Sequence, residues 1–240
     1  MARSKQINLL CLVDANSYFY MRITELNHGK TLWDYLNHSH KAQFSQVVIA
    51  ELSRNDGKFE SYYQINPDEV LKRSNQVYTF KKNPTHLMQI LFSETIVIGE
   101  KDAGEKANWA AAVDAYLQKK SVVYISDEDK AIGNKLKDKV GFLQKQLETF
   151  PFFPIWNSFD VILHLYTQGI LNIDLAQDAI TGLGQFFLTI ERNNFDFQRK
   201  TGDLNKNQYA NNIHESINRG AKRRIAYLER LQIIKKSLEI

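Results

Sequence analysis

Acidic residues end two short apolar runs of the sequence. The run Ile7–Val13 is followed at once by Asp14, and the run Ser121–Ile125 is followed by Ser126 and Asp127. This pattern is typical of buried parallel strands whose C-terminal tips carry functional groups. In an open α/β sheet, ligands bind outside the carboxyl ends of the strands, so we expect Asp14 and Asp127 to border one crevice.

Two helices are expected to bring further acids to the same crevice. Glu51 lies nearly two turns into a helix that Ser45 caps, and Asp102 and Glu105 lie at the start of an Ala-rich helix. Carboxylates that converge repel one another unless a proton or a cation joins them. Mg²⁺ and Mn²⁺ prefer oxygen ligands, and a pair of these ions can activate water for phosphodiester hydrolysis. The acids therefore indicate a divalent-metal site.

Each of these acids also has a purely structural interpretation. An Asp directly after a strand commonly caps the next helix, which applies to Asp14 and to Asp127 or Asp129. Asp102 and Glu105 have the D-x-x-E spacing of a capping-box variant, which would explain both residues without a metal. From the residues alone, both interpretations stay open.

The elements that would position these acids alternate between strands and helices, which predicts an α/β fold with a doubly wound, mainly parallel sheet. A helix is expected to begin at Tyr18 and to end at Asn27–Gly29, with Gly29 as its C-terminal stop. Further helices are expected over 46–52, 107–117, 130–140, 159–166 with Asn157 or Ser158 as its cap, 173–183 and from 207 to the end.

Composition sets the broad class of the protein. The chain has 240 residues, of which 43% are hydrophobic and 24% charged, enough for one sizeable core or one domain with an extension. No apolar run is long enough to span a bilayer, no signal-peptide pattern precedes the first strand, and Cys11 is the single cysteine. We therefore expect a cytoplasmic protein with no membrane partner.

Positive charge is concentrated at the C-terminal end. From Arg192 to Ile240 there are 11 Lys and Arg residues against 5 Asp and Glu, whereas the whole chain has a formal charge of only +4. An acidic crevice joined to a basic tail fits a polyanionic substrate. The alternative is a long surface helix that is simply rich in Lys and Arg.

Taken together, these stretches resemble PIN-domain nucleases, in particular a toxin-like subgroup. Leu12–Asn16 is similar to the opening strand with its D-x-N/S motif, and Ser45–Leu52 to the helix in which a Ser or Thr precedes the second acid. Gly104–Ala112 and Val123–Ala131 are similar to the G-E helix and the acid-rich strand tip, and 163–183 to the closing helices. The resemblance covers about residues 5–185 and implies a three-layer α/β/α fold.

The resemblance also implies a chemistry and its residues. It implies a Mg²⁺- or Mn²⁺-dependent nuclease, most simply an endoribonuclease, with DNA as a less favoured substrate. The implied catalytic and metal-binding acids are Asp14, Glu51, Glu105 and Asp127, with Asp102 and Asp129 as supporting or alternative ligands. Asn16 and Ser126 would hold the site by hydrogen bonds.

Two parts of the chain exceed the family pattern. The segment 54–95 is longer than compact members need, and the basic helical extension 186–240 follows the predicted domain 5–185. We interpret Arg219, Lys222, Arg223 and Arg224 as nucleic-acid contacts. An antitoxin-like protein inhibitor and a homodimer are further expected partners.

Other classes fit less well. A non-catalytic PIN-like module that binds RNA or protein remains the alternative function. A haloacid-dehalogenase-type phosphatase needs a second Asp two residues after the first, where this chain has Asn16. The sequence has no Walker A loop, G-x-S-x-G elbow, H-E-x-x-H motif or G-x-G-x-x-G loop.

Overall fold

The structure, a computed structural model, describes residues 8–54, 76–83, 103–127, 153–200, 202 and 206–239. Within 186–199 and 206–219 it describes the backbone only. The chain forms two compact units, one of residues 1–19 and 36–158 and the other of residues 20–35 and 159–240. The sequence predicts a domain over 5–185 and an extension over 186–240. The boundary between them falls inside the continuous helix Ile173–Lys200, and this division stays a prediction.

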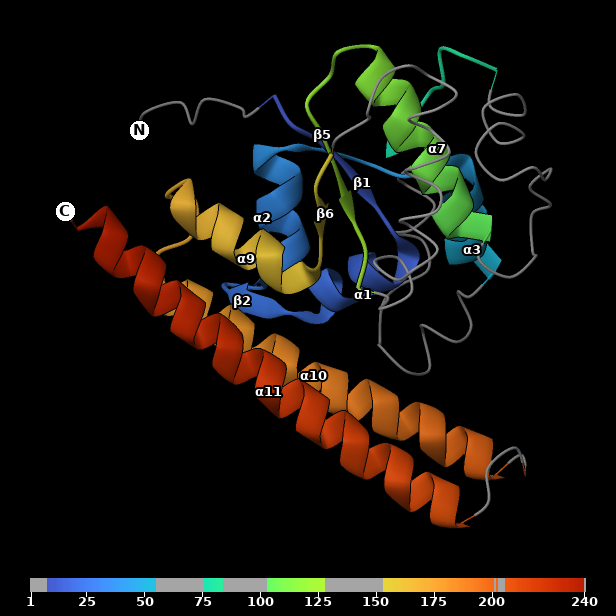
Figure 1. Cartoon of the computed structure of the whole chain (residues 1–240), viewed down its shortest axis with the longest axis vertical. Coiled ribbons are helices and arrows are strands. Elements are labelled where there is room, and N and C mark those ends of the chain that lie inside the picture. The colour runs from blue at the N-terminus through green and yellow to red at the C-terminus, as the bar shows by residue number, and fades with distance from the viewer. Residues whose placement is uncertain are drawn as a thin grey trace, which may run out of the picture. The chain divides into compact units, whose positions relative to one another are not determined.

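Among the described residues of the first unit, four parallel strands form a central sheet (Figure 1). Its strands lie in the order β4 (Lys41–Gln43), β1 (Leu10–Val13), β5 (Val122–Ile125) and β6 (Ile155–Trp156). The mainly parallel sheet that the sequence predicts is thus confirmed. The fold is mixed α/β and is compatible with three layers.

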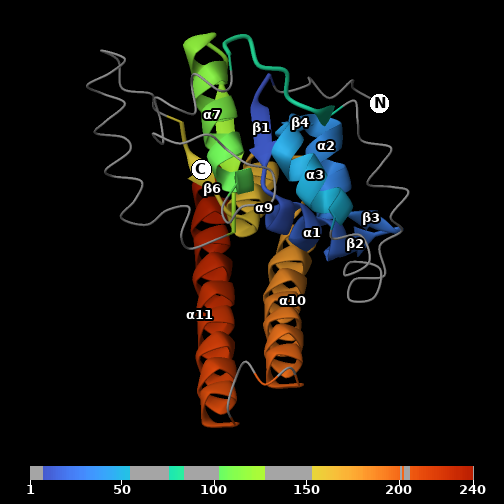
Figure 2. The ribbon, with the colours of Figure 1, turned by 90° about the vertical axis from the view of Figure 1, so that its right-hand side faces the viewer.

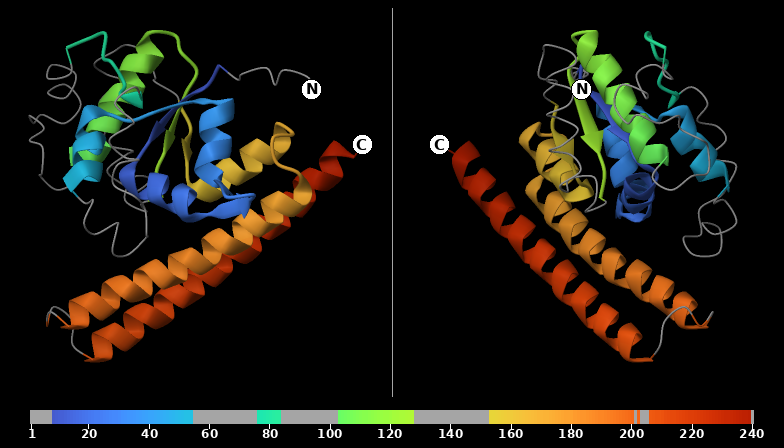
Figure 3. Two further views of the ribbon diagram at one scale, coloured as in Figure 1. Left: turned by 180° about the vertical axis from the view of Figure 1, so that it is seen from behind. Right: turned by 45° about the vertical axis from the view of Figure 1, so that its right-hand side comes forward.

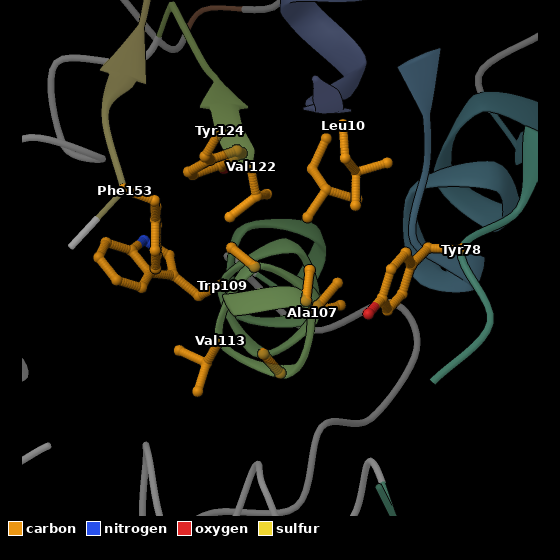
Figure 4. Packing of buried hydrophobic residues seen from close by; sticks show 13 residues of the cluster. Leu10, Tyr78, Ala107, Trp109, Val113, Val122, Tyr124 and Phe153 are labelled. Atoms are coloured by element: carbon orange, nitrogen blue, oxygen red, sulfur yellow. The ribbon is translucent and has the colours of Figure 1, made fainter. Parts of the chain in front are cut away.

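Both faces of β1 and β5 are buried, which is why these strands read as continuous apolar runs. Leu10, Leu12, Val122 and Tyr124 belong to one hydrophobic cluster with the helix α7 (Ala103–Leu117). Figure 4 shows this cluster with α7 seen nearly end-on beneath the strands. The alternate residues of β1 and β5 face the other side of the sheet and are fully buried: Cys11, Val13, Val123 and Ile125.

The helix α7 packs closely on the sheet because its contacting side chains are small. Ala110, Ala111, Ala112 and Ala115 have no exposed surface. Its second neighbour is α3 (Gln46–Arg54), which begins at the predicted cap: the Ser45 hydroxyl oxygen accepts the Val48 N–H at 3.3 Å. The helices predicted over 46–52 and 107–117 are therefore confirmed.

A short extended segment is attached beyond β4 and is anchored on α7. Phe44 and Val77 form an isolated parallel bridge, and the buried Asp114 of α7 accepts hydrogen bonds from the Tyr78 hydroxyl at 2.8 Å and from the N–H groups of Lys81 and Lys82. This anchor lies toward the C-terminal end of α7. The rest of the predicted insertion 54–95, apart from Arg54, lies outside the described residues.

The second unit contains α10 (Ile173–Lys200) and α11 (Lys206–Leu238), which lie side by side and run in opposite directions (Figures 2 and 3). The stem of Arg224 packs on Gly184, where an added Cβ would lie 3.2 Å from the Arg224 Cβ. The Tyr227 ring stacks on Phe159 with centroids 4.9 Å apart, and its hydroxyl donates to Asp160 at 2.8 Å. These contacts join α11 to α9 (Ser158–Thr167). The described residues contain no helix with the length and apolarity of a membrane span.

One predicted helix ends earlier than expected. The helix α1 covers Ala15–Ile23, and the chain then forms a hairpin of β2 (Glu25–Asn27) and β3 (Lys30–Thr31) before α2 (Leu32–Ser39). Gly29, expected to stop the helix, instead forms the hairpin turn with His28, and both have positive φ. Glycine at positive φ serves either role, and so the prediction was wrong here.

Candidate acidic site at the carboxyl ends of the strands

Asp14 and Ser126 occupy equivalent places at the ends of the neighbouring strands β1 and β5. The last pair in register is Val13 with Ile125, and the Asp14 N–H donates to the Ile125 carbonyl oxygen at 2.9 Å. The Ser126 N–H continues the ladder to Trp156 at 2.8 Å. Asp127 follows one residue later, so both predicted strand-tip acids leave the sheet at the same edge.

The side chain of Asp14 belongs to the face of the sheet that α7 covers. Side chains alternate along a strand, and Leu10 and Leu12 both pack in the α7 cluster, so Asp14 continues that series. By the same alternation, Ser126 follows Tyr124 on that face. Asp14 is only 5% exposed, which places an acidic group in a largely desolvated position.

A buried amide joins the elements around Asp14. The Asn108 side chain is fully buried, donates to the Val13 carbonyl oxygen at 3.2 Å and accepts the Ser45 N–H at 3.2 Å. It thereby fixes α7 and the start of α3 at the end of β1. Glu105 lies one turn earlier on α7 and therefore near the same strand end.

Glu51 reaches the first turn of α7 from α3. Its Oε1 accepts the Gly104 N–H at 3.1 Å, which satisfies one of the unpaired donors at a helix N-terminus. An added Cβ on Gly104 would lie 2.9 Å from the Glu51 Cδ, so only glycine allows this approach. Glu51 thus lies beside Gly104, the residue that precedes Glu105.

Tyr124 connects the acids electrostatically. Burial raises the pKa of Tyr124 well above its usual value, and the charges of Asp14 and Glu105 raise it further, while Ser126 and Asn108 act in the opposite direction. The phenol is therefore neutral at physiological pH. Asp14 and Glu105 therefore both lie within electrostatic range of this hydroxyl.

Asp127 has a structural role in addition to its place at the strand end. Its Oδ1 accepts the Ser158 N–H at 3.1 Å, and its Oδ2 accepts a short hydrogen bond from the Ser158 hydroxyl. Asp127 therefore caps the start of α9. The capping alternative considered for this residue holds, although with a helix that begins 31 residues later.

The remaining predicted residues are placed only in part. Asn16 lies in the first turn of α1, two residues after Asp14. Asp102 and Asp129 lie outside the described residues. Within the described ranges, no three His, Cys, Asp or Glu side chains form a group that could hold a metal ion. Mg²⁺, however, is often bound through one or two carboxylates and keeps its other waters, so Asp14 and Glu105 suit it by chemistry and number.

The predicted nucleic-acid contacts all fall on α11. Lys222 is exposed, Arg223 and Arg224 are partly buried, and part of the Arg224 stem is used in packing on Gly184. Arg219 lies in the part of α11 where only the backbone is described. Among the three members whose side chains the structure describes, Lys222 is thus the most exposed.

The sequence did not single out Asn108 or Tyr124 as site residues. Both lie inside apolar runs, Asn108 in Ala107–Ala112 and Tyr124 in Val122–Ile125. The available signal was a polar side chain within a run that is otherwise expected to be buried, since buried polar groups need partners.

Comparisons with known proteins leave the family open. No family model matches the chain, and neither the curated proteins nor the solved structures include a significant match.

Proposed function

We propose that this protein is a divalent-metal-dependent nuclease of the PIN type, and that RNA is its substrate. The observation that carries the proposal is the position of Asp14, only 5% exposed at the carboxyl end of β1, beside the end of the parallel strand β5 that Asp127 follows. Ligands bind at this edge in open α/β sheets. A nearly buried acid such as Asp14 costs free energy unless a proton or a cation compensates its charge.

The residues would act in distinct ways. Asp14 and Glu105 would supply the oxygen ligands for Mg²⁺ or Mn²⁺, with Glu51 and Asp127 at the two flanks of the pair. A bound ion of this type supplies an activated water and stabilises charge on the phosphate. Asn108 holds the two helices at the strand end, and Gly104 leaves the space that Glu51 occupies.

The basic helix α11 supports RNA as the partner. Lys222 is exposed and Arg223 is partly exposed, and contacts of such residues with phosphates add affinity that falls with salt. In this proposal the four predicted basic residues, Arg219 included, bind the backbone of the substrate. An endoribonuclease toxin that is kept inactive by an antitoxin-like protein is the biological role that we propose for such an activity.

The test is cleavage of single-stranded RNA with Mg²⁺ or Mn²⁺, using the wild type, Asp14→Asn and Glu105→Gln. We expect each variant to lose about 100-fold or more of the rate, because a group that stabilises transition-state charge is removed. Asp178→Asn, a change of the same type at an exposed position on α10, is the control and should keep the wild-type rate. Equal cleavage by the wild type and Asp14→Asn would refute the proposal.

The second candidate function is a module that binds RNA or protein without cleaving it. Two observations favour it: the Asp127 carboxylate is engaged by Ser158, and the described residues contain no three-residue metal group. This candidate predicts RNA binding that is unchanged by EDTA and by Asp14→Asn, with no cleavage under any metal.

A further inference from the structure

Four exposed lysines from two separate parts of the chain gather around the C-terminal end of α7. Lys81 and Lys82 belong to the segment beyond β4, and Lys119 and Lys120 follow α7. These four residues are called the lysine patch below. Within the described residues, none of their side chains forms an ion pair, so their charges are not neutralised there.

A buried carboxylate joins the two parts without using the lysine charges. Asp114 has no exposed surface, and its oxygens accept the Lys81 N–H at 3.0 Å and the Lys82 N–H at 3.1 Å. Both are main-chain donors, so the two ammonium groups take no part in these bonds. The Tyr78 hydroxyl and the Gln118 amide donate to the same carboxylate at 2.8 and 2.7 Å. Asp114 therefore holds Lys81 and Lys82 on α7 through the backbone.

The other two lysines are placed beside the first pair by the end of α7. The Lys120 Nζ lies 5.6 Å from the centre of the Tyr78 ring, and Figure 4 shows that ring beside α7 with its hydroxyl turned toward the helix. The Lys119 N–H donates to the Tyr116 carbonyl oxygen at 2.8 Å. The Lys120 N–H donates to the Ala115 carbonyl oxygen at 3.1 Å. Backbone groups thus close the helix end, and no lysine side chain is needed for it.

Lys119 occupies a backbone conformation that favours glycine. It lies two residues after the end of α7, and its φ is 58°. Glycine is preferred at this position because a Cβ is strained at positive φ. A cation near a helix C-terminus is favoured by the helix dipole, but that reason does not extend to Lys81 and Lys82, which are not part of α7. The turn and the dipole therefore do not account for the four lysines together.

The chemistry of the lysine patch fits the phosphate backbone of a nucleic acid. Ammonium groups neutralise phosphates and read no bases. Tyr78 is buried and Phe80 is partly buried, so the patch offers no exposed ring on which a base could stack. The exposed large hydrophobic residues in the described ranges all lie on α11, so the patch also lacks the apolar side chains that anchor a protein to lipid.

The lysine patch and one acid of the candidate site are carried by the same helix. Twelve residues of α7 separate Glu105 from Leu117, which corresponds to a rise of about 18 Å. An RNA strand that follows α7 would therefore meet the lysine patch at a distance from the phosphate that is cleaved. Contacts at such a distance add affinity for the substrate and leave the chemical step unchanged.

We propose that the lysine patch binds the phosphate backbone of single-stranded RNA, without preference for sequence, at a distance from the acidic site. The inference deepens the proposed function and rests on it, since it takes RNA as the substrate. It adds a binding surface that lies outside α11 and does not use the metal.

The test measures the binding of labelled oligouridylate and oligoadenylate to the full chain in EDTA, over a range of salt concentrations. The variants are Lys81→Gln with Lys82→Gln, and Lys119→Gln with Lys120→Gln. The first pair keeps both N–H groups that Asp114 accepts. We expect each double variant to bind both RNAs about 10-fold more weakly, and the slope of log affinity against log salt to fall by about 1.4 for two lost phosphate contacts.

Lys235→Gln with Lys236→Gln is the matched control. These lysines are also adjacent, lie in the last turn of another helix, and their replacement removes the same charge. This variant should keep the wild-type affinity and salt slope. An equal loss of affinity in the control would mean that total charge determines binding, and it would overturn the inference.

Lys119→Gly separates a binding role from a structural one. Glycine adopts positive φ without strain, so we expect Tm to rise, whereas the affinity for RNA should fall. A lysine that serves only the fold would not lower RNA affinity when glycine replaces it. Unchanged affinity in Lys119→Gly and in both double variants would therefore refute the inference.

The outcomes keep this inference apart from the proposed function. If the wild type binds no RNA, or binds only vesicles of phosphatidylserine and phosphatidylcholine, the inference is wrong, and the cleavage rates of the wild type and Asp14→Asn still decide the nuclease. If Asp14→Asn cleaves as the wild type does while the double variants of the patch lose affinity, the proposed catalytic site fails and the lysine patch stands.

Discussion

The Asn108 side-chain amide donates a hydrogen bond to the Val13 carbonyl oxygen at 3.2 Å and so fixes α7 at the C-terminal end of β1. Its other end accepts the Ser45 N–H. Asn108→Ala would leave both backbone groups buried without their partner, and we expect a loss of about 2–4 kcal/mol in the free energy of unfolding. Urea unfolding measures this.

The control for that measurement is another Asn that bonds one backbone group. Asn172 accepts the Leu175 N–H at 2.8 Å at the exposed start of α10, so Asn172→Ala should cost only about 1 kcal/mol. Equal losses for the two substitutions would mean that Asn108 has no special role in joining α7 to β1.

Gly104→Ala tests the approach of Glu51 to α7. The new methyl group would collide with the Glu51 carboxylate and displace it from the Gly104 N–H. Because the displaced group is the end of a flexible side chain, we expect a stability change within about 1 kcal/mol, together with weaker Mn²⁺ binding. Unchanged Mn²⁺ affinity would exclude Glu51 from the site.

Gly182→Ala is the control for glycine removal. It lies within α10, and an added Cβ there meets nothing within 4 Å. We expect this variant to be more stable by about 0.5–1 kcal/mol, since Gly is unfavourable in a helix, and to bind Mn²⁺ normally.

Two substitutions of Asp127 can distinguish its role as a helix cap from a role in catalysis. Asp127→Asn keeps an acceptor for the Ser158 N–H but removes the charge, whereas Asp127→Ala removes both. If Asp127 acts only as a cap, we expect the Ala variant to lose about 1–2 kcal/mol in the free energy of unfolding and the Asn variant to lose less. Both variants should then cleave RNA at the normal rate. If Asp127 is instead an acid of the site, we expect Asp127→Asn to lose cleavage activity even though it stays folded.

The reactivity of the Cys11 thiol tests whether this residue is buried in the sheet. Burial raises the pKa of its thiol from the usual 9.0 to about 12. We therefore expect no labelling by a thiol reagent at pH 8 in the folded protein and one equivalent after denaturation, since the thiolate is the reactive form. Prompt labelling of the native protein would contradict the burial.

The raised pKa of Cys11 also determines how its contribution to stability changes with pH. The unfolded thiol ionises first, so the unfolded state holds fewer protons above pH 9.0 and the contribution of Cys11 to stability falls as the pH rises from there toward about 12. The control is Cys11→Ala, which lacks the thiol. If the stability of the wild type rises over this pH range and that of Cys11→Ala does not, the raised pKa of Cys11 is contradicted.

Structural features that depend on neighbouring residues were predicted well from the sequence, whereas contacts between residues far apart in the chain were not. The ends of β1 and β5 and the Ser45 cap follow from neighbouring residues, and they are confirmed. Gly29 was misplaced because positive φ serves a helix end and a hairpin turn equally. The Asp127–Ser158 cap and the Asn108 bridge join residues 31 and 95 apart, which spacing along the chain cannot reveal.

The most direct measurement of the central claim is the anomalous diffraction of a crystal grown with Mn²⁺. The account predicts a Mn²⁺ peak bonded to a carboxylate oxygen of Asp14 and one of Glu105, and its loss in crystals of Asp14→Asn. A map with no peak at these two residues, or with Mn²⁺ bound elsewhere only, would contradict it.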